Sequence, residues 1–130
     1  PDMAMNIFSD SIIKNQPISV FNHGNMKRDF TYIDDIISGV RASIDKNYDC
    51  EIFNLGKKSS EDLMSMINII EDTLGIKAKI NFKDIQPGDV KETCANIDYV
   101  KEKLGYNPLV PIESGIPKFI EWFKLYYNIS

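Results

Sequence analysis

The sequence predicts a small α/β domain of α+β-like character, in which short strands pack with about five helices. About five stretches carry apolar residues at helical spacing, and short runs of apolar and β-branched residues lie between several of them. The chain has 130 residues, of which 43% are hydrophobic and 26% are charged. This composition is ordinary for a globular domain that can bury a core, so we expect one domain over residues 1–130.

The first quarter of the chain is predicted to form a helix followed by a hairpin. The hairpin has a strand from Ile18 to Phe21, a turn from Asn22 to Asn25 and a second strand from Phe30 to Ile33. The helix runs from Pro1 to Asn15, because proline is tolerated in a first turn and one helical face carries Ala4, Ile7, Phe8 and Ile12.

A second helix is predicted from about Asp35 to Asp45, with Asp34 or Asp35 as its cap. Gly39 inside this helix costs roughly 1 kcal/mol relative to alanine, so it predicts close packing against another segment. Glu51 to Gly56 is predicted to be a short buried strand. The apolar stripe of the helix consists of Ile36, Ile37, Val40 and Ile44.

The third helix is predicted to begin at a capping box formed by Ser59 and Asp62 and to end at Gly75. Polar residues then alternate with apolar ones, which indicates a half-buried strand, and the apolar positions are Ala78, Ile80 and Phe82.

Two helices are predicted in the last third. Asp98 caps a short helix that ends at Gly105. The final helix runs from Pro111 to Tyr127, and Pro117 marks either its beginning or a kink.

Charge and cysteine content exclude several classes of partner. The net charge of −4 argues against a nucleic-acid partner, and no apolar run approaches the roughly 20 residues that span a membrane. Cys50 and Cys94 lack the spacing of a zinc site or a disulfide framework, so we expect reduced thiols and a cytoplasmic location. His23 is the only histidine, which excludes a multi-histidine metal site and a Ser-His-Asp triad.

Arg28 lies shortly after the predicted turn, beside backbone groups that a tight loop leaves free. A planar guanidinium next to free N–H and C=O groups suits a ligand that carries a planar base at one end and phosphates at the other. The same residues are also typical of an ordinary hairpin with a surface arginine.

Residues Val20–Gly24 and Arg28–Asp35 resemble the nucleotide-sugar epimerases and dehydratases of the extended short-chain dehydrogenase/reductase superfamily, and most closely the bacterial UDP-glucuronate 4-epimerases. The resemblance runs from Pro1–Ala4 to Trp122–Phe123. It implies that residues 1–130 form the C-terminal, substrate-binding part of such an enzyme. The N-terminal Rossmann domain, which binds NAD in this family, would be absent from the chain, and a first residue other than methionine fits this expectation.

The resemblance also implies how a UDP-sugar would be bound. Backbone groups of residues 20–22 would contact uracil, Arg28 the diphosphate and Asp89 the ribose. Gln86 stands where many relatives carry a second diphosphate-binding arginine, which puts a clamp of two arginines in doubt. The implied substrate-binding residues are therefore Val20, Phe21, Asn22, Arg28, Gln86 and Asp89.

On the sugar side, the resemblance points to Asp2, Met3, Asn54 and Thr93. The residues themselves leave alternatives open, because Asp2 is suited to cap the first helix and Thr93 to lie in a surface loop. Asp34 and Asp35 are interpreted as helix caps rather than catalytic groups.

The sequence contains no Gly-rich strand-to-helix turn and no Tyr-x-x-x-Lys pair, so it predicts no catalytic or NAD-binding residue and no metal site in this chain. The resemblance implies an NAD-dependent isomerase that converts UDP-glucuronate to UDP-galacturonate for polysaccharide precursors, with the isolated chain inactive. Apolar surface left open by the absent domain would favour self-association. The alternatives are the same lobe of a nucleotide-sugar dehydratase, decarboxylase or reductase, or a binding domain without enzymatic activity.

Overall fold

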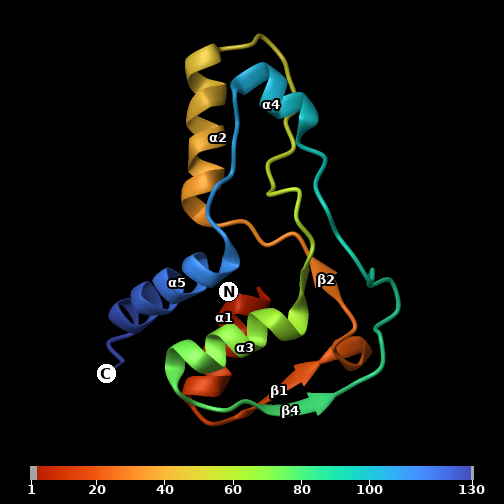
Figure 1. Ribbon diagram of the computed structural model, residues 1–130, viewed down its shortest axis with the longest axis vertical. Coiled ribbons are helices and arrows are strands. Elements are labelled where there is room, and N and C mark those ends of the chain that lie inside the picture. Colours follow the sequence, from red (N-terminus) through yellow and green to blue (C-terminus); the bar gives the residue numbers. More distant parts are fainter. Residues whose placement is uncertain (1–2, 130) are drawn as a thin grey trace.

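The computed structural model describes residues 3–129, which form five α-helices and two small sheets (Figure 1). The predicted α/β class with about five helices is confirmed. The helices are α1 (Ala4–Ile13), α2 (Ile33–Lys46), α3 (Leu63–Leu74), α4 (Asp98–Leu104) and α5 (Ile112–Tyr126). The strands are β1 (Pro17–Val20), β2 (Lys27–Arg28), β3 (Glu61–Asp62) and β4 (Lys79–Phe82), and a 3-10 turn, η1 (Phe21–Gly24), follows β1.

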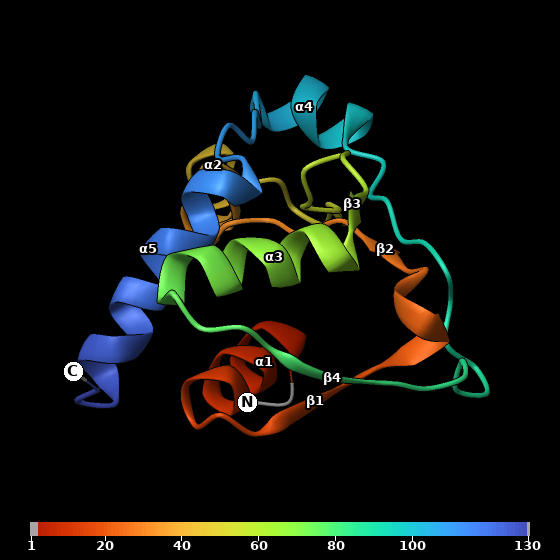
Figure 2. The ribbon, with the colours of Figure 1, turned by 60° about the horizontal axis from the view of Figure 1, so that its bottom comes forward.

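The two sheets lie in different parts of the molecule (Figure 2). Strands β1 and β4 pair in parallel, with Ile18 opposite Ile80, whereas β2 and β3 pair antiparallel, with Arg28 opposite Glu61. Helices α1 and α3 lie beside the β1–β4 sheet, and α2 lies with α4 at the opposite end (Figures 1 and 2). None of the helices in residues 3–129 combines the length and the apolar character that a membrane crossing requires.

The main core lies between α1, β1, α3 and α5. Ile18 and Val20 are at most 1% exposed, because a strand turns alternate residues to one face and Ser19 to the other. The helices contribute residues at the predicted helical spacing, namely Phe8, Ile12, Met66, Ile67, Ile70, Ile112, Ile116 and Ile120.

Helix α2 packs by a face of small residues rather than by its apolar stripe. A Cβ at Gly39 would lie 2.5 Å from Leu55 Cδ2 and 3.0 Å from Tyr106 Cδ2, which confirms the predicted close packing. Of the predicted stripe, only Ile36 is partly buried. The residues that we call the α2 stripe are 42% to 70% exposed, and they are Ile33, Ile37, Val40 and Ile44.

The predicted hairpin is wrong, because β1 and β2 belong to different sheets. After β1, Asn22 and His23 both adopt left-handed conformations, with φ of 49° and 51°, and the chain leaves the β1–β4 sheet. Strand β1 finds its partner about sixty residues later in β4, a non-local pairing that local patterns do not reveal. The second predicted strand, Phe30 to Ile33, is extended chain without pairing, and α2 begins at Ile33.

The predicted caps and one predicted strand are also wrong. No side chain caps α2, and its N-cap residue is Tyr32. The Asp35 carboxylate instead accepts the N–H groups of Leu109 and Val110, both at 3.0 Å, and so ties α2 to the segment before α5. Glu51 to Gly56 forms no strand, since nothing in residues 3–129 pairs with it.

At the third helix, the Ser59 hydroxyl donates to Glu61 Oε1 at 2.9 Å, so the predicted capping box does not form. Asp98 does not cap α4 either, because it is the first residue of the helix, the N-cap residue is Ile97 and no side chain caps this end. The predicted glycine stops are confirmed, since Gly75 and Gly105 end α3 and α4 with φ of 68° and 69°.

The last helix is continuous from Ile112 to Tyr126. Pro117 lies inside it, so this proline does not mark its beginning.

Candidate functional site

Strand β2 lies at the centre of the candidate site. The Lys27 N–H donates to the Lys91 carbonyl at 2.8 Å, and the Lys27 carbonyl accepts the Thr93 N–H at 3.2 Å. Residues 91–93 therefore run beside β2, which also pairs with β3. This arrangement places the connection after β4 against β2.

Three hydrogen bonds fix the Arg28 guanidinium. Nη1 donates to the carbonyls of Lys27 at 2.8 Å and Lys91 at 3.3 Å. Nη2 donates to Asp89 Oδ1 at 2.9 Å, and these two side chains are only 25% and 32% exposed. A guanidinium has five N–H donors, so these bonds within residues 3–129 leave two for a ligand.

Asp89 reaches Arg28 from a tight turn. Its N–H donates to the Gln86 carbonyl at 3.1 Å, and Gly88 adopts φ of 85° between them. A Cβ at Gly88 would meet open space, so glycine is needed here for its left-handed conformation rather than for room. The fold thus joins two of the predicted site residues, 61 positions apart, in one ion pair.

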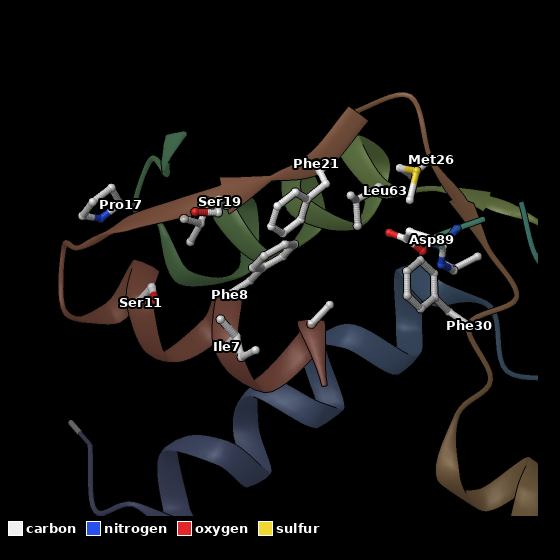
Figure 3. Close-up of a pocket in the computed structure, with 13 residues that line it drawn as sticks. Ile7, Phe8, Ser11, Pro17, Ser19, Phe21, Met26, Phe30, Leu63 and Asp89 are labelled. Carbon is white, nitrogen blue, oxygen red and sulfur yellow. Dashed lines mark hydrogen bonds and ion pairs between the residues drawn. The ribbon is translucent and has the colours of Figure 1, made fainter. Parts of the chain in front are cut away.

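A cavity of about 470 Å³ ends at this ion pair and is lined mainly by apolar side chains of α1, β1 and their neighbours. Pro17 lies at one end, Phe8 and Phe21 face each other along the middle, and Asp89 lies near Phe30 at the other end (Figure 3). The cavity therefore combines an apolar body with one charged end.

The three residues predicted to contact uracil take different positions. Val20 is fully buried, and its carbonyl accepts the Lys83 N–H at 2.9 Å. Phe21 lines the cavity, and Asn22 lies outside its lining, with its side chain donating to the Asn25 carbonyl at 2.7 Å. Among the three, the structure brings only Phe21 to the cavity.

A second cavity of about 410 Å³ adjoins the first, because Phe30 lines both. Met3, which is 69% exposed, lines this second cavity. Thr93 is held by a hydrogen bond, in which its Oγ1 accepts the Asp29 N–H at 3.3 Å. Asn54 and Gln86 are exposed and line neither cavity, and Asp2 lies outside the described residues.

The sequence did not predict most of the apolar residues that line the first cavity. A signal existed for Ser19, which is the polar position between the apolar Ile18 and Val20, and Ser19 lines the cavity together with Ile18. The sequence predicts Phe8 only as a helix-face residue, and Leu63 enters the lining through the non-local approach of α3. Asp29, which organises the loops around Arg28, was also missed.

The geometry suits an anionic ligand with an apolar ring. An apolar cavity with a few placed polar groups is the usual form of a small-molecule site. The free donors of Arg28 can make charge-assisted hydrogen bonds to phosphate oxygens, while the aromatic walls can flank a planar ring.

Residues 1–56 match the family described as NAD dependent epimerase/dehydratase. The chain is 46% identical over 123 residues to protein MJ1055 of Methanocaldococcus jannaschii, covering 95% of this chain and 38% of that protein. It is 38% identical over 145 residues to UDP-glucuronate 4-epimerase 4 of Arabidopsis thaliana, covering 98% of this chain and 33% of that enzyme.

Among solved structures, the chain is similar to the UDP-glucuronic acid 4-epimerase of Bacillus cereus in complex with UDP-4-deoxy-4-fluoro-glucuronic acid and NAD. The TM-score is 0.88 at 32% identity, covering 98% of this chain and 41% of that one. The chain spans about two fifths of the length of the first curated relatives that it matches.

Proposed function

This chain belongs to the NAD-dependent epimerase/dehydratase family, and we propose that it is the UDP-sugar-binding part of a nucleotide-sugar 4-epimerase. The observation that carries the proposal is the position of Arg28 at the charged end of the apolar cavity. Uracil occupies the aromatic part near Phe21, and the diphosphate takes the two remaining donors of Arg28. The second carboxylate oxygen of Asp89, Oδ2, accepts from the ribose hydroxyls.

We further propose that the sugar is glucuronate and that the complete enzyme interconverts UDP-glucuronate and UDP-galacturonate. Relatives and structural neighbours named for UDP-glucuronate 4-epimerase activity, at 38% and 32% identity, support this choice. Under this proposal, Met3, Asn54 and Thr93 remain the sugar-side candidates. The enzyme acts in the cytoplasm on precursors of polysaccharides.

The complete enzyme uses NAD, and we propose that another part of the protein binds it. The residues of this chain do not fit the cofactor, since the sequence has no Gly-rich strand-to-helix turn and no Tyr-x-x-x-Lys pair. The α2 stripe provides a docking surface for the dinucleotide-binding part. Its exposure and the greater length of the relatives, of which the chain covers 38% to 44%, support this role.

Turnover by the complete protein tests the proposal. With NAD and UDP-glucuronate, we expect UDP-galacturonate as the product, separated by anion-exchange chromatography. A dehydratase, decarboxylase or reductase would give another product or prefer another nucleotide sugar. A binding domain without enzymatic activity would give no product at all.

Binding of UDP to the complete protein, measured by calorimetry, tests the site separately from the sugar. If UDP binds but UDP-glucuronate is not converted, the choice of sugar is wrong and the site stands. If UDP gives no heat, the assignment of the cavity is wrong.

A further inference from the structure

We propose that Asp29 is a positioning residue for the diphosphate, which holds Arg28 and the Asp89 turn in the arrangement that binds it. The inference rests on the proposed function of the cavity. Asp29 lines the second cavity but not the first, and it bonds to none of the remaining donors of Arg28 in the contacts that residues 3–129 make. Its influence therefore passes through the backbone.

Three backbone donors converge on the Asp29 carboxylate. Oδ1 accepts the Lys57 N–H at 2.9 Å, and Oδ2 accepts the N–H groups of Lys58 at 3.0 Å and Ala95 at 2.8 Å. These donors come from two loops that are far apart in the sequence. One carboxylate thus joins the loop before β3 to the segment after the Asp89 turn.

The same segment carries the groups that hold Arg28. Residues 91–93 bond to Lys27, the Lys91 carbonyl accepts from Arg28 Nη1, and Asp89 accepts from Nη2. Ala95 and Thr93 anchor the far end of this segment on Asp29. Release of that end would free the chain from residue 89 to residue 95 to shift away from the guanidinium.

Packing around Gly56 leaves little room for Asp29 to move. A Cβ at Gly56 would lie 2.4 Å from the Ala95 Cβ and 3.0 Å from Asp29 Oδ2. The glycine lets the loop carrying Lys57 and Lys58 approach closely enough to donate both N–H groups. The carboxylate therefore sits in a preformed cradle of donors.

An amide cannot replace this carboxylate. Three N–H donors face the two oxygens, and asparagine offers one oxygen and an NH₂ group that would point at a donor. Asp29→Asn therefore leaves at least one N–H facing another donor, which weakens the connection between the two loops. The side-chain volume stays nearly the same, so the change tests hydrogen bonding rather than packing.

The test compares the affinities of the complete protein for UDP and for uridine, which differ by the diphosphate. The ratio isolates the contribution of Arg28 from that of the base. We expect UDP to be preferred by the wild type, and Asp29→Asn to reduce that preference by roughly tenfold, as loss of a charged hydrogen bond does. Uridine affinity should change much less.

Asp35→Asn is the matched control. Asp35 also accepts two backbone N–H groups, from Leu109 and Val110, but it lies on α2 and contacts no part of the 89–95 segment in the described hydrogen bonds. A loss of stability without a change in the UDP-to-uridine ratio is expected for this variant. If both variants shift the ratio equally, Asp29 acts only through general stability and the inference is wrong.

Thr93→Val keeps the inference testable if Asp29→Asn does not fold. Thr93 is exposed, so its hydroxyl can be removed without opening the core, and only the 3.3 Å bond from the Asp29 N–H is lost. A smaller fall in the ratio, about twofold, is expected from one weak bond. An unchanged ratio in every folded variant overturns the role of Asp29, whereas a wild type that prefers uridine or binds neither compound overturns the proposed function itself.

Discussion

At the residue scale, the ion pair between Arg28 and Asp89 limits how a phosphate can approach. Both side chains are mostly shielded, at 25% and 32% exposure, and Asp89 Oδ1 also accepts the Val90 N–H at 2.9 Å. Asp89 offsets the charge of Arg28 and at the same time fixes its plane. Under the proposed function, a diphosphate would therefore be bound through the direction of the remaining N–H groups as much as through net charge.

Replacement of Arg28 tests this assignment. Arg28→Ala in the complete protein should weaken UDP-sugar binding by about 10- to 150-fold, the equivalent of roughly 1.5–3 kcal/mol for a charged hydrogen-bonding partner. Calorimetric titration measures the change. Arg41→Ala removes another arginine, which is 83% exposed and 3.9 Å from Asp45, and should leave binding unchanged. Equal affinities of wild type and Arg28→Ala would remove the phosphate role.

Glu71 supplies a prediction about pH. Burial raises the pKa of its carboxyl, but the bonds from Lys77 Nζ and the Ala78 N–H, both 2.7 Å, and the Lys77 charge outweigh burial and lower the pKa below 4.5. A carboxyl whose pKa is lower in the folded state than in the unfolded state stabilises the fold at pH values above the pKa of the unfolded state. This contribution is lost as the pH falls through the pKa of the folded state. Glu71→Gln should therefore reduce the free energy of unfolding most at neutral pH.

Chemical denaturation at neutral pH and at a pH below 4.5 measures this dependence. The difference in the free energy of unfolding between wild type and Glu71→Gln should be smaller at the lower pH. Asp10→Asn, at a carboxylate that is 43% exposed and paired with Lys14, should cost little at either pH. A gap that is constant with pH would mean that the ionised carboxylate contributes nothing.

At the element scale, the helices were predictable and the strand pairing was not. The helices depend on local signals, such as the apolar spacing of α3 and the glycine stop at Gly75. The pairing of β1 with β4 and the use of Asp35 as an acceptor for Leu109 depend on contacts between distant segments. For the same reason, the sequence singled out Arg28 and Asp89 separately but not their ion pair, and it missed Asp29.

Two glycines that allow elements to approach each other give a paired prediction. Gly56→Ala should destabilise the chain by about 1–3 kcal/mol, because its Cβ would meet the Ala95 Cβ at 2.4 Å, and neither atom can rotate away. Gly39→Ala should cost less, since its nearest contact, at 2.5 Å, is the end of the Leu55 side chain and alanine favours the helix by about 1 kcal/mol. Thermal unfolding ranks the two, and the reverse order would contradict the packing argument.

At the scale of the whole molecule, two clusters of buried residues divide the chain. The larger one joins α1, β1, α3 and α5, and the smaller one joins α4 with Tyr106 and its neighbours. Strand β2 and the 89–95 segment run side by side along one edge of the molecule (Figure 1). They carry Arg28 and Asp89, the charged end of the cavity. Helix α2 covers the smaller cluster with one face and presents the α2 stripe to solvent with the other.

The α2 stripe should make the isolated chain associate with itself. Four aliphatic side chains in one row, each 42% to 70% exposed, form the kind of contiguous apolar surface that promotes association. We expect sedimentation velocity to show species larger than a monomer that increase with concentration. The double variant Ile37→Lys and Ile44→Lys should remain a monomer, because each lysine places a charge in the contact.

The variant Leu125→Lys tests whether association depends on the α2 stripe or on any exposed apolar side chain. Leu125 is 73% exposed on α5, more than any residue of the α2 stripe, but it lies outside that stripe. Association of Leu125→Lys should equal that of the wild type, and all three proteins should bind UDP at most weakly, since a further part of the enzyme would complete the cleft. If the wild type is monomeric at every concentration, or if Leu125→Lys abolishes association while the double variant does not, the α2 stripe is not the contact surface.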